Sequence, residues 1–293
     1  MTVHDEGTLK RADGPCESHG TSSRRSLRER PSLYFHATMP DKPRVVVGLL
    51  HGYAEHGKRY EHVADAWAER GIATVAIDLR GHGKAEGRRG HCDRFQEFLD
   101  DGAELTRLCR ERAPDLPAVL FGHSFGGLVA ASVAIARPSP WRALALSGPF
   151  FGVASKVPLA KRLAGRVATR IAPTLAIPTG LSGKDVTHDA ARGRAYDEDP
   201  LVFKTATARW FTETEAAQEK AIARAASLTM PLLLVIGLAD HVVSVPRARA
   251  FFDAAGSSDK TWDGREGLFH EVLNEVEWRP IADRFAEWIL AHA

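Results

Sequence analysis

The sequence predicts an α/β protein whose mostly parallel central sheet is flanked by helices and interrupted by one helical insertion. Short, continuous apolar runs alternate along the chain with segments whose apolar residues recur at helical spacing, as in parallel sheets covered on both faces. This alternation stops at Gly148-Pro149 and resumes at Pro231, so an insertion is predicted between them. With 293 residues, 44% hydrophobic and 26% charged, the chain is long enough for one large core and such an insertion.

The first half of the chain supplies five expected strands and three expected helices. The strands are apolar runs at residues 33–38, 45–50, 73–77, 118–121 and 143–146. The helices are expected at residues 59–70, 95–112 and 126–137. In the first helix Val63, Ala66 and Trp67 share one side, and Gly71 ends the helical pattern.

The second half repeats the alternation after the insertion. We expect a strand at residues 231–237, a helix at 246–255, a short strand at 260–262 and a final helix at 275–291. The insertion carries no buried-strand run and is predicted to be largely helical, lying over the strand ends as a cap. The predicted division is therefore an N-terminal strand or flexible segment (1–32), a first core part (33–150), a helical cap (151–226) and a second core part (227–293).

Composition excludes several classes of protein. A formal net charge of +2 gives no global field for nucleic acid, and residues 11–31, rich in Gly, Ser and Arg, are predicted to be a mobile loop or tail. The three cysteines have neither metal-ligand spacing nor an even disulfide framework, which fits a reducing compartment.

Because no apolar run reaches about 18 residues and no signal-peptide core is present, we expect a cytoplasmic protein, with peripheral membrane contact left open. The oligomeric state does not follow from the sequence.

The segment GHSFG (122–126) carries the strongest chemical signal. It matches G-x-S-x-G, follows an apolar strand and opens a helix, which is the setting in which a serine hydroxyl is exposed on a strained turn. The flanking glycines are needed where backbones approach too closely for a Cβ. Ser124 is therefore the candidate nucleophile, with a structural turn serine as the alternative.

A serine nucleophile needs a base, and the base needs an orienting carboxylate. Asp240 is the candidate acid because it follows the apolar strand at 231–237 and so lies at a strand's carboxyl end. Three other aspartates do not directly follow a strong buried strand: Asp253, Asp259 and Asp263. His270, in the loop before the last helix, is the candidate base. His241 is the rival, but it adjoins the acid on one loop and would have difficulty spanning acid and nucleophile.

The loop after the strand at 45–50 is the candidate oxyanion loop. The backbone N–H of Tyr53 is expected to act with that of Phe125, the residue after the nucleophile. His51 is interpreted as structural, with its ring bonded to backbone. The glycines of residues 81–87 have the spacing GxGxxxG, without the acidic partner of a dinucleotide site, and indicate a shaped loop.

Four segments together resemble the monoacylglycerol lipase and lysophospholipase branch of the α/β hydrolases. They are HGYAEHGKRY (51–60), DLRGHGKAEGRRG (78–90), GHSFGG (122–127) and the pair LADHVV (238–243) and EGLFHEVLNE (266–275). The resemblance covers roughly residues 33–293 and extends to LSGPFF (146–151) and YDEDPL (196–201). It implies an α/β-hydrolase fold, hydrolysis of an ester between one fatty acyl chain and glycerol, and no metal or cofactor.

The resemblance also implies roles for individual residues. In the family, the residues that correspond to Glu55, Arg59, His123 and Tyr196 lie near the glycerol end of the substrate. The alternative is that they brace the oxyanion loop through an ion pair and hydrogen bonds. Where the family often has Ala-Gly, this chain has Tyr53-Ala54, which would narrow the site.

The insertion begins with a basic amphipathic helix, predicted over residues 156–171. Its apolar face either contacts an anionic membrane surface or lipid aggregate, or packs on the core. Phe151, Ile177 and Leu181 are assigned by position to an apolar acyl tunnel. Other enzymes of the same fold stay open as alternatives, namely a lysophospholipase, a general carboxylesterase or an acyltransferase. A non-catalytic lipid-binding protein is the alternative from another class.

Overall fold

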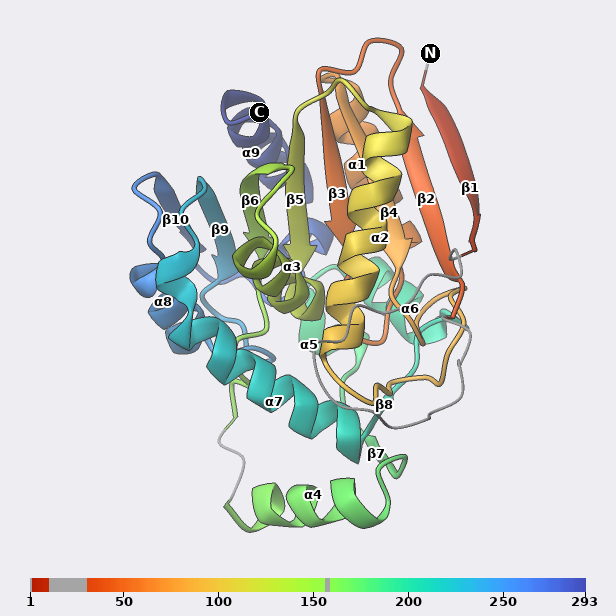
Figure 1. Cartoon of the computed structure of the whole chain (residues 1–293), viewed down its shortest axis with the longest axis vertical. Helices are drawn as coiled ribbons and strands as arrows, with labels where there is room; N and C mark the ends of the chain where they lie inside the picture. Colours follow the sequence, from red (N-terminus) through yellow and green to blue (C-terminus); the bar gives the residue numbers. More distant parts are fainter. Residues whose placement is uncertain (1, 11–30, 156–158) are drawn as a thin grey trace, which may run out of the picture.

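The computed structural model describes residues 2–10, 31–155 and 159–293 of the chain, and its centre is an eight-stranded sheet (Figure 1). The strand order is β1-β2-β4-β3-β5-β6-β9-β10. The strands are β1 (Val3–Leu9), β2 (Leu33–Met39), β3 (Val45–Leu50), β4 (Ile72–Asp78), β5 (Ala118–His123), β6 (Trp141–Ser147), β9 (Leu232–Gly237) and β10 (Lys260–Arg265). Strands β1 and β2 pair antiparallel with their neighbours, whereas all pairs from β4 to β10 are parallel. The predicted mostly parallel sheet is thus confirmed.

Helices cover both faces of the sheet. Helices α1 (Glu61–Ala68) and α9 (Trp278–Ala291) pack on one face. On the opposite face lie α2 (Gln96–Arg112), α3 (Ser124–Ala136) and α8 (Val245–Ala254). Successive residues of β3 alternate between the two cores, with Val45 and Val47 on the first face and Val46 on the second. This two-sided burial explains why the central strands are continuous apolar runs in the sequence.

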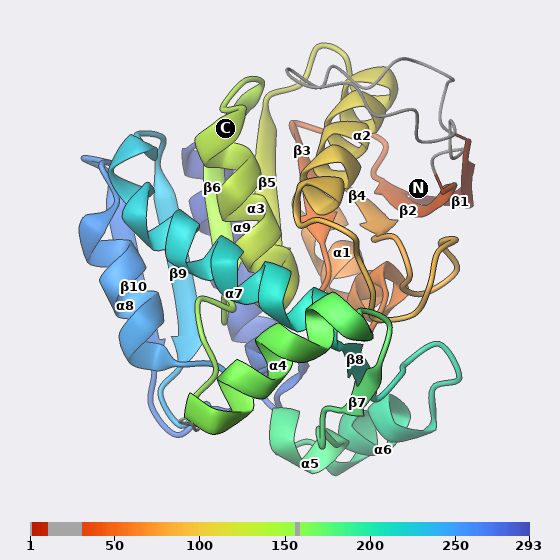
Figure 2. The same cartoon turned by 60° about the horizontal axis from the view of Figure 1, so that its bottom comes forward.

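The insertion between β6 and β9 lies mainly beyond the carboxyl ends of the parallel strands (Figures 1 and 2). It contains α4 (Leu159–Ile171), α5 (Gly183–Val186), α6 (Ala190–Glu198) and α7 (Ala208–Ala223). It also contains two strands that the sequence analysis did not predict, β7 (Ala176–Pro178) and β8 (Thr205–Thr207), which pair antiparallel. Each has three residues, and β7 is exposed, so neither produces the apolar run that marks a buried strand.

Most other differences from the expected elements are at their ends. The last helix begins at Trp278 instead of residue 275, because the short 3-10 helix η3 (Val272–Asn274) and a turn precede it. Helix α1 is preceded by the 3-10 helix η1 (Gly57–Tyr60), and a third 3-10 helix, η2 (Ala225–Ser227), follows α7. Of the predicted tail at 11–31 all but residue 31 lies outside the described residues, as do residues 156–158 of the predicted amphipathic helix. Within the described ranges, none of the helices has the length and apolar character needed to cross a membrane.

Candidate active site

Ser124 stands at the tight junction of β5 and α3. Its φ of +51° is left-handed, a conformation that costs energy in a residue with a Cβ and that is stored at functional turns. The two neighbouring glycines make the junction possible. A Cβ on Gly122 would lie 2.5 Å from the carbonyl oxygen of Gly126, and a Cβ on Gly126 would lie 2.2 Å from that of Leu50. The turn therefore has the form expected of a strand–serine–helix junction.

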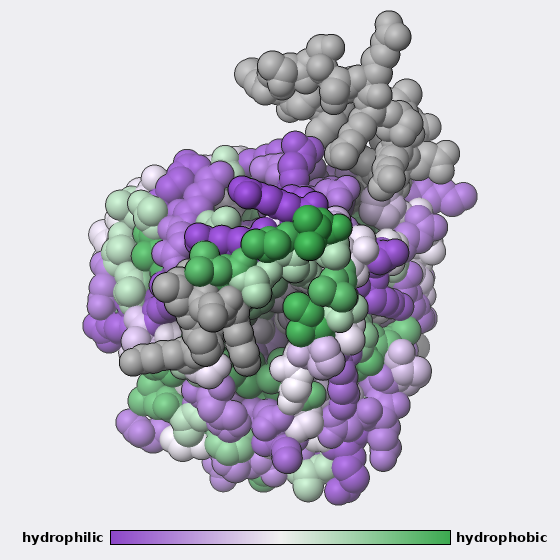
Figure 3. Space-filling view, turned by 90° about the horizontal axis from the view of Figure 1, so that it is seen from below, coloured by the Kyte–Doolittle hydropathy of each residue, from purple (hydrophilic) through white to green (hydrophobic). Residues whose placement is uncertain are grey.

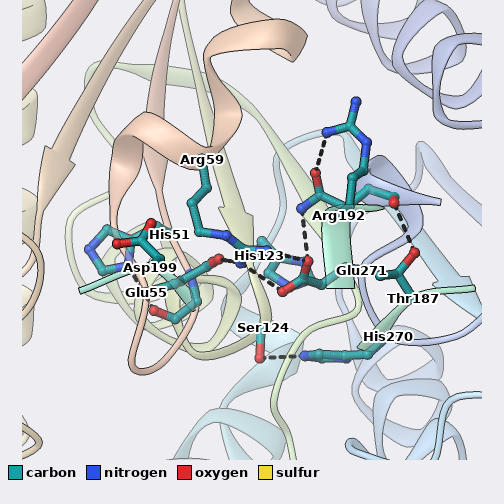
Figure 4. Close-up of polar contacts among 12 residues, drawn as sticks. His51, Glu55, Arg59, His123, Ser124, Thr187, Arg192, Asp199, His270 and Glu271 are labelled. Carbon is teal, nitrogen blue, oxygen red and sulfur yellow. Dashed lines mark hydrogen bonds and ion pairs between the residues drawn. The ribbon is translucent and has the colours of Figure 1, made fainter. Parts of the chain in front are cut away.

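The structure brings together Ser124 at the start of α3, Asp240 after β9 and His270 after β10. His270 Nε2 lies 2.8 Å from Ser124 Oγ (Figure 4). On the other side of the ring, His270 Nδ1 lies 2.7 Å from Asp240 Oδ2. Asp240 Oδ1 accepts from the backbone N–H groups of Val242 and Val243, at 2.8 and 2.9 Å. Because the carboxylate accepts from Nδ1–H, the lone pair of Nε2 faces the serine hydroxyl. This geometry suits transfer of the hydroxyl proton to the imidazole.

The charges of the acid and the base stabilise each other in a buried environment. Burial alone would raise the pKa of Asp240, but the charge and hydrogen bond of His270 lower it below its usual range. Burial alone would lower the pKa of His270, but the charge and hydrogen bond of Asp240 raise it. The interaction thus favours the ionised carboxylate of Asp240 and the protonated imidazole of His270.

The rival residues have other partners. His241 Nδ1 contacts the carbonyl of Ala239, at 3.3 Å. The three alternative aspartates contact basic side chains elsewhere, in the pairs Arg249–Asp253, His292–Asp259 and Arg265–Asp263. Within the described residues none of these three carboxylates hydrogen-bonds to His270.

The backbone N–H groups of Tyr53 and Phe125 are the expected oxyanion donors. Phe125 is the second residue of α3, where the first turn leaves N–H groups without helical partners. In the described part of the chain neither amide donates a hydrogen bond. Next to Tyr53, Ala54 has a φ of +65°. This left-handed conformation favours glycine, which the family that the sequence resembles often has at this position.

Hydrogen bonds with buried polar side chains hold the oxyanion loop in place. Gly52 N–H donates to Glu55 Oε1 at 2.6 Å. Leu79 N–H donates to His51 Nε2 at 3.0 Å, so Nδ1 carries the proton and donates to the carbonyl of Gly52 at 2.7 Å. Burial lowers the pKa of His51 to about 4, which keeps the ring neutral. The predicted structural role of His51 thus agrees with its contacts.

The tyrosine that departs from the family pattern joins the oxyanion loop to the insertion. Tyr53 Oη donates to the carbonyl of Thr205 in β8 at 2.8 Å. Its ring lies with its centroid 3.8 Å from that of Trp210 in α7 and 5.9 Å from that of Phe125. The side chain therefore fills space between the oxyanion loop and the insertion, while the predicted narrowing of the site stays a prediction.

The four residues assigned to the glycerol end by resemblance lie close to the catalytic loops, and the polar side chains of Glu55, Arg59 and His123 have protein partners. Glu55 accepts from Tyr60 Oη at 2.7 Å and forms an ion pair with Arg59. The guanidinium of Arg59 lies 4.8 Å from the ring centroid of Tyr196. His123 Nδ1 lies 3.1 Å from Ser147 Oγ, and burial lowers the pKa of His123 to about 4. These contacts fit the alternative in which the residues brace the oxyanion loop.

Sequence reasoning missed Glu271, the residue after the candidate base. Its two carboxylate oxygens accept from the two terminal nitrogens of Arg59, both at 2.8 Å (Figure 4). Asn274 Nδ2 donates to Glu271 Oε2 at 2.8 Å, and Arg192 of α6 donates to Asn274 Oδ1 at 3.0 Å. The available signal was a single acidic residue directly after the histidine, between the apolar pairs Leu268-Phe269 and Val272-Leu273.

Beside the oxyanion loop, Asp78 ties two loops to the end of β4. Its two oxygens accept from Gly57 N–H and Lys84 N–H, both at 2.8 Å. Gly83, in the shaped loop at 81–87, has a φ of +49°, and a Cβ there would lie 2.2 Å from Asp78 Oδ2. Burial raises the pKa of Asp78, but the His36 ring 3.5 Å from Oδ1, the charge of His51 and the two backbone N–H groups together lower it to about 2.

The three residues assigned to an acyl tunnel lie in different environments. Phe151 is fully buried, and its ring stacks on Phe251 with centroids 4.0 Å apart. Ile177 is 47% exposed on β7, and Leu181 is partly buried. The tunnel assignment stays a prediction.

From residue 163 to its end, helix α4 leaves its large apolar side chains exposed. Thr169 is on its inner side, where it accepts from Thr212 of α7 at 3.1 Å. The apolar side chains that share the outer surface with Arg166 and Arg170 are Leu163, Val167 and Ile171, together with Leu175 and Ile177 beyond the helix. Figure 3 shows apolar residues gathered on this face. The side chains of Leu163, Val167 and Ile171 thus do not pack on the core, and contact of this face with a membrane surface or lipid aggregate stays a prediction.

The comparisons with known proteins agree on one group. Residues 41–277, a range that includes the three candidate catalytic residues, match the family described as serine aminopeptidase, S33. The chain is 34% identical to a monoacylglycerol lipase of Mycolicibacterium smegmatis, over 85% of this chain and 89% of that protein. It is 33% identical to the phospholipase YtpA of Bacillus subtilis, over 81% of this chain and 92% of that protein. The crystal structure of Paleococcus ferrophilus monoacylglycerol lipase superposes with a TM-score of 0.80 and 28% identity, covering 89% of this chain and 99% of that one.

Proposed function

The chain belongs to the serine aminopeptidase S33 family of α/β hydrolases, and we propose that it hydrolyses monoacylglycerols through Ser124, His270 and Asp240. It is a carboxylic ester hydrolase of the acylglycerol lipase type, as its relatives and structural neighbour indicate. The observation that carries the catalytic assignment is the continuous pair of contacts from Ser124 Oγ to His270, at 2.8 Å, and from His270 to Asp240, at 2.7 Å.

The proposed reaction has two acyl-transfer steps. His270 Nε2 takes the Ser124 proton while Ser124 Oγ attacks the ester carbonyl carbon. The N–H groups of Tyr53 and Phe125 stabilise the negative charge on the carbonyl oxygen. The imidazolium then protonates the leaving glycerol oxygen, which leaves an acyl-enzyme. A water molecule deprotonated by His270 attacks this ester, and the fatty acid leaves as the proton returns to Ser124 Oγ.

Two relatives with similar identity support two different lipid substrates. The proposal favours a monoacylglycerol because one sequence relative and the structural neighbour are both monoacylglycerol lipases. A lysophospholipid is the second candidate, because the Bacillus subtilis relative is a phospholipase. Both substrates carry one acyl chain on a glycerol unit, and they differ in the polar group that the site must accept.

Activity of Ser124→Ala tests the nucleophile. Ester hydrolysis and labelling by a fluorophosphonate probe should both be lost, while the circular dichroism spectrum and thermal midpoint stay close to those of the wild type. A panel of 1- and 2-monoacylglycerols, lysophospholipids and short aryl esters then tests the substrate. A higher kcat/KM for lysophospholipids than for monoacylglycerols would reject the substrate proposal, and near-normal activity of Ser124→Ala would reject the catalytic one.

We also propose that the exposed apolar face of α4 contacts lipid surfaces. Three large apolar side chains at 51–79% exposure, beside Arg166 and Arg170, form the kind of surface that enters the boundary of an anionic bilayer. Replacing Leu163, Val167 and Ile171 by Ser should reduce sedimentation with anionic phospholipid vesicles and leave short-ester hydrolysis intact. Val276→Ser removes another exposed apolar side chain, which is outside α4, and serves as the control. Equal vesicle binding by the triple variant and the wild type would contradict this proposal.

A further inference from the structure

Behind the oxyanion loop, two buried carboxylates share one guanidinium. Glu55 and Glu271 are 2% and 4% exposed, and both form ion pairs with Arg59 (Figure 4). Among the described residues, the other hydrogen-bond partners of these carboxylates are neutral donors: the N–H of Gly52 and the hydroxyl of Tyr60 for Glu55, and the amide of Asn274 for Glu271. The cluster formed by Glu55, Arg59 and Glu271 therefore holds two negative charges against one positive charge.

Arg192, a nearby cation, does not cancel this excess, because it has its own carboxylate partner, Asp189, at 3.8 Å. Burial lowers the pKa of His62, which Arg192 contacts, to about 4, so this ring is neutral. The buried cluster thus keeps a net negative charge. Because an uncompensated buried charge destabilises the folded state, the retention of this one needs a reason, and the place of the cluster in the fold supplies it.

The cluster touches both parts of the proposed catalytic machinery. Glu271 follows His270 in the chain, and its own N–H donates to the carbonyl of Val186 at 2.8 Å, which fixes this backbone next to the imidazole. Glu55 accepts from Gly52, the residue before the proposed oxyanion donor Tyr53. Since Arg59 bonds to both carboxylates, one guanidinium joins the histidine loop to the oxyanion loop across 212 positions of sequence.

The charged and titratable groups around His270 come from several elements. Asp240 follows β9 and bonds to Nδ1, while His123, at the end of β5, has its ring centroid 4.9 Å from that of His270. Glu55 and Arg59 come from the segment after β3, and Glu271 from the histidine loop itself. Short helix α5, whose Val186 holds the Glu271 backbone, carries Lys184, which is exposed, and Asp185, which is partly buried.

We propose that Glu271 is a positioning residue of the reaction, which acts through Arg59 to fix the oxyanion loop and supplies, with Glu55, a buried negative charge that favours the protonated form of His270. This proposal rests on the catalytic role of His270 given above. During acyl transfer the imidazole becomes an imidazolium in a buried site, since His270 is 4% exposed. A fixed excess of negative charge lowers the energy of that intermediate without any rearrangement.

The electrostatics agree with this assignment. Burial lowers the pKa of His270, whereas the charge and hydrogen bond of Asp240, and after them the charges of Glu271 and Glu55, raise it. Burial raises the pKa of Glu271, but the charge and hydrogen bonds of Arg59 lower it to about 2, so Glu271 is ionised throughout the pH range in which His270 titrates. The influence of Glu271 on His270 is therefore constant while the enzyme works.

The pH dependence of kcat/KM on a soluble aryl ester measures this effect, because its acid limb reports proton binding to the free base. Glu271→Gln keeps the shape of the side chain and removes its charge. The acid limb should move to lower pH, since the imidazole loses a charge that favours its protonation. At optimal pH, kcat should fall by about tenfold, with KM within about twofold, because the charge acts on the imidazolium that forms during the reaction. Glu271→Asp should keep the acid limb at the wild-type position.

Two further variants separate this effect from a general loss of packing. Glu55→Gln removes the second carboxylate of the cluster and should move the acid limb in the same direction. If Glu271→Gln does not fold, the acid limb of Glu55→Gln tests the charge role of the cluster in its place. Glu275→Gln is the matched control, because Glu275 is 2% exposed and bonds to Phe269 N–H and His188, outside the cluster. Its acid limb should stay at the wild-type position.

The outcomes distinguish this inference from the proposed function. Wild-type acid limbs in the folded Glu271→Gln and Glu55→Gln variants would overturn the charge role, and so would an equal shift in Glu275→Gln. Fluorophosphonate labelling of Ser124 in the same variants reports the nucleophile independently. If labelling persists while the acid limb does not move, the inference fails and the proposed function stands. If the wild type is not labelled at Ser124, the proposed function fails first.

Discussion

Replacement of Asp240 by Asn tests the proposed triad through the direction of one hydrogen bond. In the native site Oδ1 accepts from two backbone N–H groups, those of Val242 and Val243, and Oδ2 accepts from His270 Nδ1. An asparagine has one oxygen, and the two N–H donors hold that oxygen on their side. Its NH2 group must then face His270. Because NH2 and Nδ1–H are both donors, no hydrogen bond can form between them. The ring is therefore driven to the tautomer with the proton on Nε2, which cannot accept the Ser124 proton.

The expected loss follows from the removal of this proton acceptor and of the buried charge opposite the imidazolium. Changes of this kind reduce kcat by roughly 10⁴-fold, which corresponds to about 5.4 kcal/mol of transition-state free energy. The assay is the steady-state hydrolysis of a short aryl ester at neutral pH, with fluorophosphonate labelling of Ser124 as a second readout. Because the substitution preserves shape, the protein should remain folded. A folded Asp240→Asn variant that retains more than about a tenth of the wild-type kcat would refute the reasoning.

Two further predictions concern stability. The pKa of Asp78 falls from 3.8 to about 2 on folding, a difference that stabilises the fold by about 2 kcal/mol above pH 4 and is lost as the pH falls toward 2. Asp78→Asn should therefore lower the unfolding free energy in urea by about 2 kcal/mol at pH 7 and by progressively less below pH 4; a deficit independent of pH would contradict the linkage. Gly126→Ala places a Cβ 2.2 Å from the Leu50 carbonyl oxygen and should cost about 1–3 kcal/mol by urea unfolding, together with a loss of esterase activity. Gly165→Ala in α4, where no atom lies within 4 Å of the new Cβ, is its control and should not be destabilised by more than the error of the measurement.

Features encoded by local pattern could be predicted from the sequence. The central strands were found because burial on both faces makes each of them a continuous apolar run, as in β3 and β9. Strand β1 was predicted only as an N-terminal strand within residues 1–32. Its bounds did not follow from the sequence, because six of its seven residues are not buried and its pairing with β2 leaves no apolar pattern. The exposed strand β7 and its partner β8 gave no signal for the same reason.

The candidate catalytic residues belong to the predictable part as well. Ser124 was identified by a motif within one strand–helix junction, and Asp240 and His270 by their order and by the strands and helices that they flank. The short contacts among them require the tertiary structure, but their selection did not, because the ends of parallel strands meet at one edge of the sheet.

The sequence by itself therefore determined the fold class and the family, and it selected the candidate catalytic residues. The tertiary structure decided how the site is supported: Arg59 lies between Glu55 and Glu271, Tyr53 reaches β8 and α7, and α4 leaves its apolar face exposed. The physical reason is the range of the interactions. Apolar periodicity and turn residues act over a few positions and leave a local record, whereas an ion pair between residues 212 positions apart exists only once the chain has folded.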